Sequence, residues 1–326
     1  MFQWLQSWQR WWWPETGPVA DGLRVCFLGD GVSGSWQMRA AQIAETRPGW
    51  EAMATKDLRS SDVARFDLFC IVKRFDAAKA EWLRSQGKAV VYDVVDPWKQ
   101  PEDGEACPAL HEVVGYFRRM LSPMVVDGVI FPNATMLDDL GHFVPRPTHI
   151  YHHHRVYQEP IIVCRQATRV GDEGREDYLG PWAETAAGVC ERLGLEWVVN
   201  PKSLTSLDIG LAVRGGRNGT LMAKRYKSNV KLANLFAAGL PAIAHAEEAS
   251  YRETDDGHVR FFADEASLEK AIVELLPYER RLAVHKAFLA HSRRFRVETI
   301  AEQYEAYFRR VLESCAKQGT RRSAAA

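Results

Sequence analysis

The fold of this chain is indicated most clearly by residues 223–245, AKRYKSNVKLANLFAAGLPAIAH. Cations open the stretch, and either Ser228 or Asn229 is placed to cap a helix whose apolar positions recur along one face. Gly239 stops that helix, and residues 240–244 follow as a short buried strand, which completes half of an α/β repeat. A helix N-terminus beside lysines presents unpaired N–H groups and positive charge, so the stretch predicts a phosphate or diphosphate site.

Composition limits the classes of protein to which the chain can belong. It has 326 residues, 46% of them apolar, which is enough for two ordinary cores. Lys plus Arg and Asp plus Glu both number 42, so the balance argues against nucleic acid as a partner. Six scattered cysteines lack C-x-x-C spacing, and no apolar run is long enough to span a membrane. We therefore expect a cytoplasmic protein with a local anion site.

The first 22 residues form a tryptophan-rich segment with indoles at positions 4, 8, 11, 12 and 13. Indoles favour the membrane–water boundary, which predicts a peripheral contact with the inner face of the membrane. However, Arg10 is the segment's one cation, so it gains little from anionic lipid. The alternative is a docking segment that covers a hydrophobic groove on this protein or on a second copy of it.

Residues 23–157 alternate between strand and helix patterns. The expected strands are 24–28, 67–72, 89–94, 127–131 and 148–151, and the expected helices are 36–46, 76–86, 109–121 and 133–141. Such alternation predicts a parallel sheet with helices on both faces. The loop at 29–35 matches the glycine spacing of dinucleotide-binding loops, but a tight turn explains these glycines equally well.

Residues 158–300 begin a second alternating series. Its expected strands are 161–164, 196–199, 208–213, 240–244 and 259–262, with a long helix at 176–193. The tail is helical from 267 to 317; residues 301–318 are expected to cross back to the first half, and 319–326 to be disordered. We therefore predict an α/β protein of two Rossmann-like domains, 23–157 and 158–300, that face each other across a cleft.

The second half resembles the donor-binding domain of bacterial GT-B glycosyltransferases. The residues that carry the resemblance are the strand DIGLAV at 208–213, the K-S-N-x-K motif at 227–231 and the A-G-x-P strand that ends at Pro241. It covers roughly 160–310, and the first half matches in architecture alone. Many retaining members carry an E-x7-E motif before the helix, where this chain has RGGR at 214–217 and KRYK at 224–227.

The resemblance implies a transfer reaction. A sugar would move from a nucleotide-sugar donor to a saccharide or glycolipid acceptor, without metal or other cofactor, in surface polysaccharide or glycan assembly. A sugar-nucleotide epimerase of the same two-domain shape and a non-catalytic scaffold are the alternatives.

The donor site must stabilise negative charge on the departing nucleoside phosphate. Cations and the helix N-terminus supply the first predicted donor-binding residues: Arg214, Arg217, Lys224, Lys227, Ser228, Asn229 and Lys231. After the next strand, Glu247 and Glu248 have carboxylates that could accept sugar or ribose hydroxyls, and Tyr251 of the same stretch is a further predicted donor-binding residue. The competing interpretations are a solvated basic loop and an acid that caps the following helix.

The first half is expected to supply the catalytic base and the acceptor site. The base candidates are Asp30, Asp93 and Asp96, of which the last two lie at a strand's carboxyl end, where ligands bind in open α/β sheets. Histidines 152–154 are further candidates, although adjacent residues in an extended run cannot converge on one metal ion. Each aspartate could instead cap a turn. Lys73, Arg74 and Trp98 are the predicted acceptor contacts.

Overall fold

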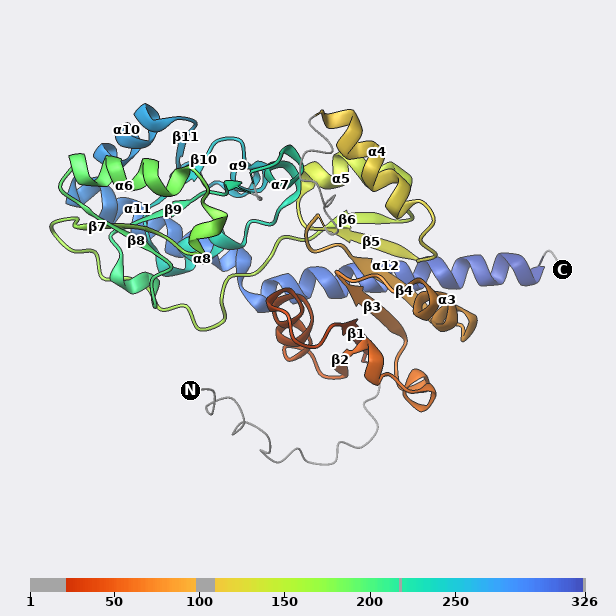
Figure 1. Cartoon of the computed structure of the whole chain (residues 1–326). Helices are drawn as coiled ribbons and strands as arrows, with labels where there is room; N and C mark the ends of the chain where they lie inside the picture. Colours follow the sequence, from red (N-terminus) through yellow and green to blue (C-terminus); the bar gives the residue numbers. More distant parts are fainter. Residues whose placement is uncertain (1–21, 98–108, 217–218, 325–326) are drawn as a thin grey trace.

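A computed structural model describes residues 22–97, 109–216 and 219–324, with side chains described up to residue 317. These residues form two α/β domains joined by a long linker (Figure 1). The tryptophan-rich segment, Trp98 and Arg217 lie outside the described residues.

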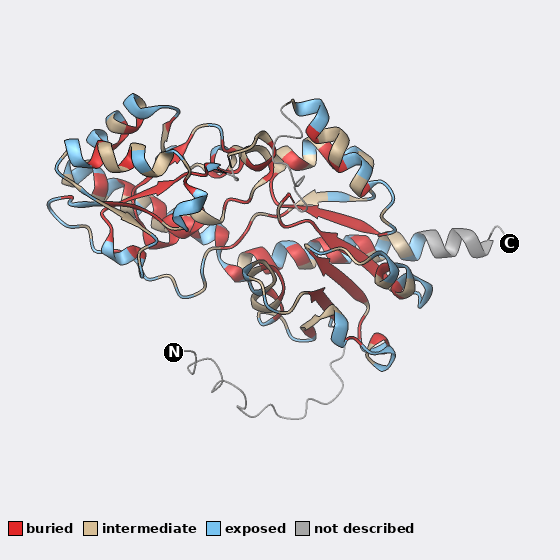
Figure 2. Cartoon of the chain, in the orientation of Figure 1, coloured by how far each residue is buried: buried red, intermediate tan, exposed pale blue. Residues whose placement is uncertain are grey.

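The first domain is built on a parallel sheet of six strands in the order β2-β1-β3-β4-β5-β6. The strands are β1 (Val25–Gly29), β2 (Trp50–Ala54), β3 (Leu68–Val72), β4 (Ala89–Asp93), β5 (Gly128–Phe131) and β6 (Pro147–His149). Its helices are α1 (Gly34–Trp36), α2 (Gln42–Ala44), α3 (Ala77–Ser85), α4 (Leu110–Leu121) and α5 (Ala134–Leu140), with a π-helical turn between α1 and α2. The central strands are buried along their whole length, as in sheets covered on both faces (Figure 2).

The second domain is built on a parallel sheet of five strands in the order β11-β10-β9-β7-β8. The strands are β7 (Arg169–Asp172), β8 (Glu196–Val199), β9 (Ile209–Ala212), β10 (Ala242–His245) and β11 (Arg260–Phe262). Its helices are α6 (Trp182–Arg192), α7 (Leu221–Tyr226), α8 (Val230–Ala238), α9 (Ala249–Thr254), α10 (Glu265–Leu275) and α11 (Tyr278–His291). Gly239 ends α8 at φ +60°, a left-handed conformation that glycine adopts without strain.

Each sheet has one point where the strand order reverses. In the first domain the chain leaves β1 towards β2 and then returns to β3 on the other side, so the reversal lies between β1 and β3. By the same reasoning, the reversal in the second domain lies between β7 and β9. Open α/β sheets bind ligands outside the carboxyl ends of the strands at such points. The topology therefore offers two places for a ligand.

The C-terminal helix α12 (Val297–Ala324) crosses from the second domain to the first, as predicted, and lies along the first sheet (Figure 1). Tyr304 and Phe308 are buried in one core with Phe27 and Trp50. The ring centroids of Phe27 and Tyr304 lie 5.8 Å apart. The helix begins before the expected residue 301 and extends past 318, into residues for which the sequence predicted disorder.

Four elements differ from the sequence-based expectation. The long helix expected at 176–193 is a 3-10 turn at Glu176–Tyr178 followed by α6, which begins only at Trp182. Strand β2, which follows the Pro48-Gly49 turn, was not predicted. It lies at the sheet edge, and its mostly half-buried residues show no clear alternation of apolar and polar side chains. Residues 161–164 are not a strand, because they run past the end of α8, where Ile161 N–H donates to the Ala238 carbonyl at 2.8 Å; the sheet begins at β7 instead. Finally, helix α7 replaces part of the expected basic loop.

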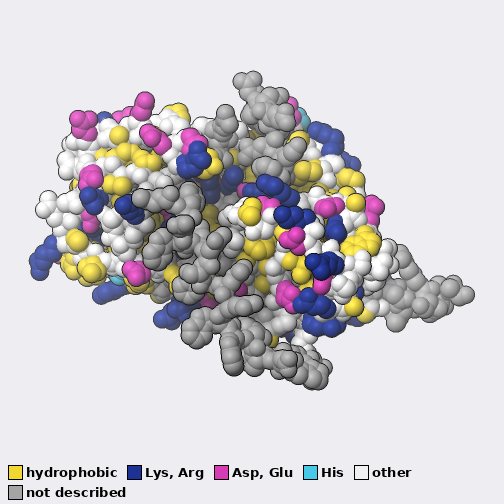
Figure 3. Space-filling model, turned by 60° about the horizontal axis from the view of Figure 1, so that its bottom comes forward, with side chains coloured by type: hydrophobic (Ala, Val, Ile, Leu, Met, Phe, Trp, Pro, Cys, Tyr) yellow, Lys and Arg dark blue, Asp and Glu magenta, His cyan; other side chains and the backbone are white. Residues whose placement is uncertain are grey.

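Lys and Arg side chains are interspersed with Asp and Glu over the face shown in Figure 3, in keeping with the balanced formal charge. Among the residues that the structure describes, no helix is both long and apolar enough to cross a membrane.

Candidate active site between the two domains

Helix α7 docks the second domain onto the first. Its Met222 and Tyr226 are buried in a core of the first domain, where the Tyr226 ring lies 5.5 Å from that of Phe117 in α4. Arg225 Nη2 donates to Asp139 of α5 at 2.9 Å, and the Tyr226 hydroxyl donates to the same carboxylate at 2.9 Å. Apolar burial and ion pairing thus act together to hold the second domain against α4 and α5 of the first.

A second contact between the domains joins α9 to the start of α5. Glu253 accepts hydrogen bonds from the backbone N–H groups of Ala134 and Thr135 at 2.9 and 2.8 Å, and the Tyr151 hydroxyl donates to it at 3.0 Å. A carboxylate at a helix N-terminus is favoured by both hydrogen bonding and the helix dipole. Glu253 therefore fixes the relative position of the domains, a role that was not predicted from the sequence.

Asp96, Lys73 and Lys227 meet where the domains face each other. The Lys73 ammonium lies 3.0 Å from Asp96 Oδ2, and Lys227, which precedes α8 in the second domain, lies 3.6 Å from the same oxygen. Asp96 Oδ1 is buried without a hydrogen-bond partner among the described residues. Burial, with Arg214 and Lys73 nearby, lowers the pKa of Lys227, although Asp96 acts in the opposite direction. A predicted base and a predicted donor ligand are thus adjacent.

The backbone that presents Lys73 and Asp96 is strained. Lys73 has φ +64° and Val95 has φ +66°, and each is the central residue of a tight turn in which N–H bonds to the carbonyl two residues earlier. A β-branched residue such as Val95 rarely adopts this conformation. The Tyr92 hydroxyl stabilises the first turn by donating to the Lys73 carbonyl at 2.8 Å. Such strain is concentrated at functional sites, which supports a role for this cluster.

Asp93 takes a structural place instead of the predicted catalytic one. It is fully buried, and both its oxygens lie 3.0 Å from the Arg39 guanidinium. The Tyr304 hydroxyl of α12 donates to it as well. A carboxylate with these partners links the sheet to α12 and has no access to a substrate, so we no longer propose Asp93 as the base.

His152 is the histidine of the 152–154 run that faces this region. Both its ring nitrogens are buried without a partner among the described residues, whereas His153 Nε2 bonds the Met38 carbonyl at 2.7 Å. Burial and the nearby Arg39 hold the pKa of His152 well below its usual value. The imidazole is therefore neutral near pH 7 and could donate or accept one hydrogen bond.

Asn229 positions the linker that carries His152. Its side-chain oxygen accepts the His152 N–H at 2.9 Å, and its amide group donates to the His152 carbonyl at 3.4 Å. This side chain was predicted to bind the donor, but in the structure both of its polar atoms bond the protein backbone instead. Ser228 is also buried, and its carbonyl accepts from Arg214 Nη2 at 2.7 Å.

The predicted donor cations are paired with carboxylates. Arg214 bonds the buried Glu248 at 2.6 Å and lies over the Tyr251 ring, 4.9 Å from its centroid. Lys224 pairs with Glu247 at the surface. Arg214 is thus buried and paired, and it does not belong to a solvated basic loop. Burial raises the pKa of Glu248 against the opposing effect of Arg214.

Lys231 occupies the strand-order reversal of the second domain. Its ammonium lies 2.7 and 2.8 Å from the two oxygens of buried Asp172 and donates to the Val213 carbonyl at 3.1 Å. Burial raises the pKa of Asp172, while Lys231 lowers it. Asp172 was not predicted as a site residue, because β7 is short and weakly apolar and was not recognised as a strand. Its position at the carboxyl end of that strand is the feature that could have identified it.

Several buried polar atoms between the end of β10 and α9 have no protein partner among the described residues: His245 Nδ1, Glu248 Oε1, Ser250 Oγ and Tyr251 Oη. Buried polar groups are normally satisfied, so a cluster of exceptions marks a place where a polar ligand or water would gain hydrogen bonds. Within the described part of the chain, no three His, Cys, Asp or Glu side chains are grouped to hold a metal ion.

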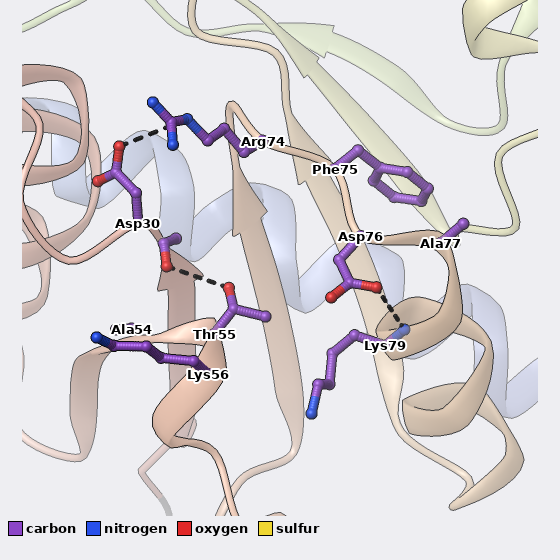
Figure 4. A pocket seen from close by; sticks show the side chains of 10 residues that line it. Asp30, Ala54, Thr55, Lys56, Arg74, Phe75, Asp76, Ala77 and Lys79 are labelled. Atoms are coloured by element: carbon purple, nitrogen blue, oxygen red, sulfur yellow. Dashed lines mark hydrogen bonds and ion pairs between the residues drawn. The ribbon is translucent and has the colours of Figure 1, made fainter.

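A pocket of about 790 Å³ lies at the strand-order reversal of the first domain (Figure 4). It is lined by the ends of β1 and β2, the loops after β1, β2 and β3, and the start of α3: Gly29, Asp30, Ala54, Thr55, Lys56, Arg74, Phe75, Asp76, Ala77 and Lys79. Two predicted residues, Asp30 and Arg74, are brought together here, 3.7 Å apart. Asp30 Oδ1 accepts the N–H groups of Val32 and Ser33, which is the turn-capping role weighed above.

The glycines of the 29–35 loop serve packing and turn geometry. A Cβ on Gly29 would lie 2.2 Å from the Trp36 ring, and Gly31 has φ +82°. The geometry of the turn therefore explains why the glycine spacing of this loop matches that of dinucleotide-binding loops.

No protein-family model and no curated protein matches the sequence. Solved structures match the fold. Sucrose-phosphate synthase from Thermosynechococcus elongatus has a TM-score of 0.61 at 11% identity, with 89% of this chain and 100% of that chain covered. HepE of Anabaena, in complex with UDP and glucose, has a TM-score of 0.57 at 13% identity, with 88% and 99% covered.

An Escherichia coli trehalose-6-phosphate structure bound with UDP-2-fluoro glucose has a TM-score of 0.56 at 10% identity, with 86% of this chain and 98% of that chain covered. The chain therefore has a glycosyltransferase-type fold. In particular it is the GT-B fold, with two Rossmann-like domains and a C-terminal helix that crosses back, as the sequence predicted.

Proposed function

We propose that the chain is a metal-independent glycosyltransferase that moves a sugar from a nucleotide-sugar donor to an acceptor held by the first domain. The observation that carries this proposal is the approach of Lys227, beside the predicted donor helix, to Asp96 at a strand end of the first domain. Groups suited to the two halves of a transfer reaction meet at that point. The resemblance of the second half adds a role in surface polysaccharide or glycan assembly.

On the donor side, the phosphates would compete with carboxylates for cations that are already in place. Arg214 and Lys224 are held by Glu248 and Glu247, and Lys227 by Asp96. A diphosphate offers more negative charge than one carboxylate, and the unpartnered polar atoms of Glu248 and Tyr251 beside Arg214 could bond the rest of the donor. The UDP and the UDP-2-fluoro glucose in two structures of the same fold support a nucleotide sugar as donor.

On the acceptor side, Asp96 is the base we propose. In an inverting reaction its carboxylate would take the proton from the acceptor hydroxyl as that oxygen attacks the anomeric carbon. The nucleoside diphosphate would leave with the electron pair of the broken bond, and Lys227 would stabilise the charge on its oxygen. In a retaining reaction the same carboxylate would position the substrates. His152 is the second candidate, because its neutral imidazole has unpartnered nitrogens.

Donor binding and Asp96 substitution together test this proposal. Calorimetry with UDP-, GDP-, dTDP- and CMP-sugars should detect at least one donor; a folded protein that binds none would refute the proposal. Asp96→Asn should keep donor binding and reduce transfer about 100- to 10,000-fold. The matched control is Asp138→Asn, an exposed aspartate on α5 of the same domain. Turnover of donor without acceptor would instead indicate the epimerase alternative.

A further inference from the structure

The pocket in the first domain and the proposed reaction centre share one turn of the chain. Lys73 and Arg74 are consecutive residues of one strained turn after β3. Lys73 is directed to Asp96, and Arg74 is directed to Asp30 at the pocket (Figure 4). Because the turn is fixed by the Tyr92 hydroxyl, the pocket and the proposed base have a constant relative position. A molecule in the pocket would therefore lie beside Arg74, one residue along the chain from the lysine that contacts Asp96.

The pocket has the volume of a small-molecule site. Its volume of about 790 Å³ falls within the usual range of roughly 300–1,000 Å³ for such sites. Phe75, Ala54 and Ala77 supply apolar surface, against which the face of a sugar ring could pack. Thr55 donates its hydroxyl hydrogen to the Gly29 carbonyl at 3.2 Å, which joins the ends of β1 and β2 and gives the pocket a fixed wall.

The charges of the pocket favour an anion. Lys56, Arg74 and Lys79 come from the loops after two different strands and from the start of α3, and they lie on different sides of the pocket (Figure 4). The two carboxylates have structural roles. Asp76 caps α3 by accepting the Lys79 N–H at 2.9 Å, and hydrogen bonds from the loop lower the pKa of Asp30 despite its burial. The cations thus exceed the acids.

We propose that this pocket binds the acceptor and that the acceptor is anionic, its phosphoryl or carboxylate group lying among Lys56, Arg74 and Lys79. The identification of the bound molecule as the acceptor rests on the proposed function. The binding of an anion is inferred from the pocket alone. Charge-assisted hydrogen bonds from several cations are the interactions that select a phosphate or carboxylate over a neutral hydroxyl.

Calorimetry without nucleotide sugar tests the pocket by itself. The probes are glucose 6-phosphate, glucuronate, neutral glucose and inorganic phosphate. We expect at least one of the charged sugars to bind about tenfold or more tightly than glucose, and its affinity to fall as salt is raised. Comparison of the phosphate ester with glucuronate distinguishes a phosphoryl from a carboxylate acceptor, and inorganic phosphate reports the contribution of the anion alone.

A matched pair of double variants locates the binding. Lys56→Ala/Lys79→Ala should weaken the charged sugar about tenfold or more, whereas Lys270→Ala/Lys286→Ala removes the same charge from exposed positions of α10 and α11 and should change nothing. Equal affinity for glucose and the charged sugars, no binding of any probe, or equal behaviour of the two double variants would overturn the inference. Absence of donor binding would refute the proposed function while leaving this result intact.

Discussion

Replacement of Arg39 by methionine should leave the Asp93 carboxylate without its ion-pair partner in the core of the first domain. The Arg39 side chain is fully buried and gives two hydrogen bonds of 3.0 Å to Asp93. It also donates to the carbonyls of Ile150 and Tyr151 at 2.9 and 3.0 Å. Methionine keeps the apolar stem but lacks the guanidinium group, so the variant removes the hydrogen bonds and the charge together with the atoms that fill the end of the site.

The expected loss is about 3–5 kcal/mol, the usual cost of removing one partner of a buried ion pair. The hydroxyl of Tyr304 still donates to Asp93 and limits the loss, while the two carbonyls left without a donor add to it. A domain is typically stable by about 5–15 kcal/mol, so the variant should fold but unfold at much lower urea concentration.

Urea titration followed by circular dichroism measures this free energy. Arg39→Met/Asp93→Asn should lose less than the sum of its two single variants, because asparagine leaves no buried charge. Arg24→Met is the control, since it breaks the exposed Arg24–Asp67 pair and should cost less than about 1 kcal/mol. If Arg39→Met were as mild as this control, the reasoning about Asp93 as a structural residue would be wrong.

Two further predictions concern the domain contact and pH. Glu253→Gln removes the charge that caps α5, so it should cost about 1–2 kcal/mol and speed amide exchange at Ala134 and Thr135; unchanged exchange would contradict the role assigned to Glu253. The pKa of His152 is lowered by burial, with Arg39 and Lys73 adding to the effect, so the unfolded chain takes up its proton first. The free energy of unfolding should therefore fall below about pH 6.5, by up to about 1.4 kcal/mol per pH unit for this residue, and calorimetry of His152→Gln should show a shallower fall. Equal slopes would count against a neutral, buried His152.

Local chemistry explains which elements could be predicted. Helix α8 was predicted from a continuous apolar face ended by Gly239, and both signals lie within one short stretch. The central strands of both sheets are apolar runs between polar loops, a pattern that needs no knowledge of distant residues. Prediction failed at β2, because an edge strand is only half buried.

Pairing between distant residues explains which parts of the site could not be predicted. The K-R-Y-K run is typical of a basic loop, yet Tyr226 is buried because α4 and α5 of the other domain offer it an apolar surface. Asp93 and Asp96 have the same type and almost the same place along the chain. Only the folded structure separates them, since Arg39 and Tyr304 reach one while Lys73 and Lys227 reach the other.

The crossing of α12 has a consequence for synthesis on the ribosome. The first domain is made first, but part of its core consists of Ile300, Tyr304 and Phe308, which are translated only after every strand of the second domain. At about 5–20 residues per second, its sheet would wait on the order of ten seconds for these side chains, with one apolar face uncovered. The second domain is continuous in sequence and can complete its core earlier. The domain that is synthesised first is thus the one that completes its core last. While it waits, the nascent first domain exposes hydrophobic surface to which a chaperone could bind.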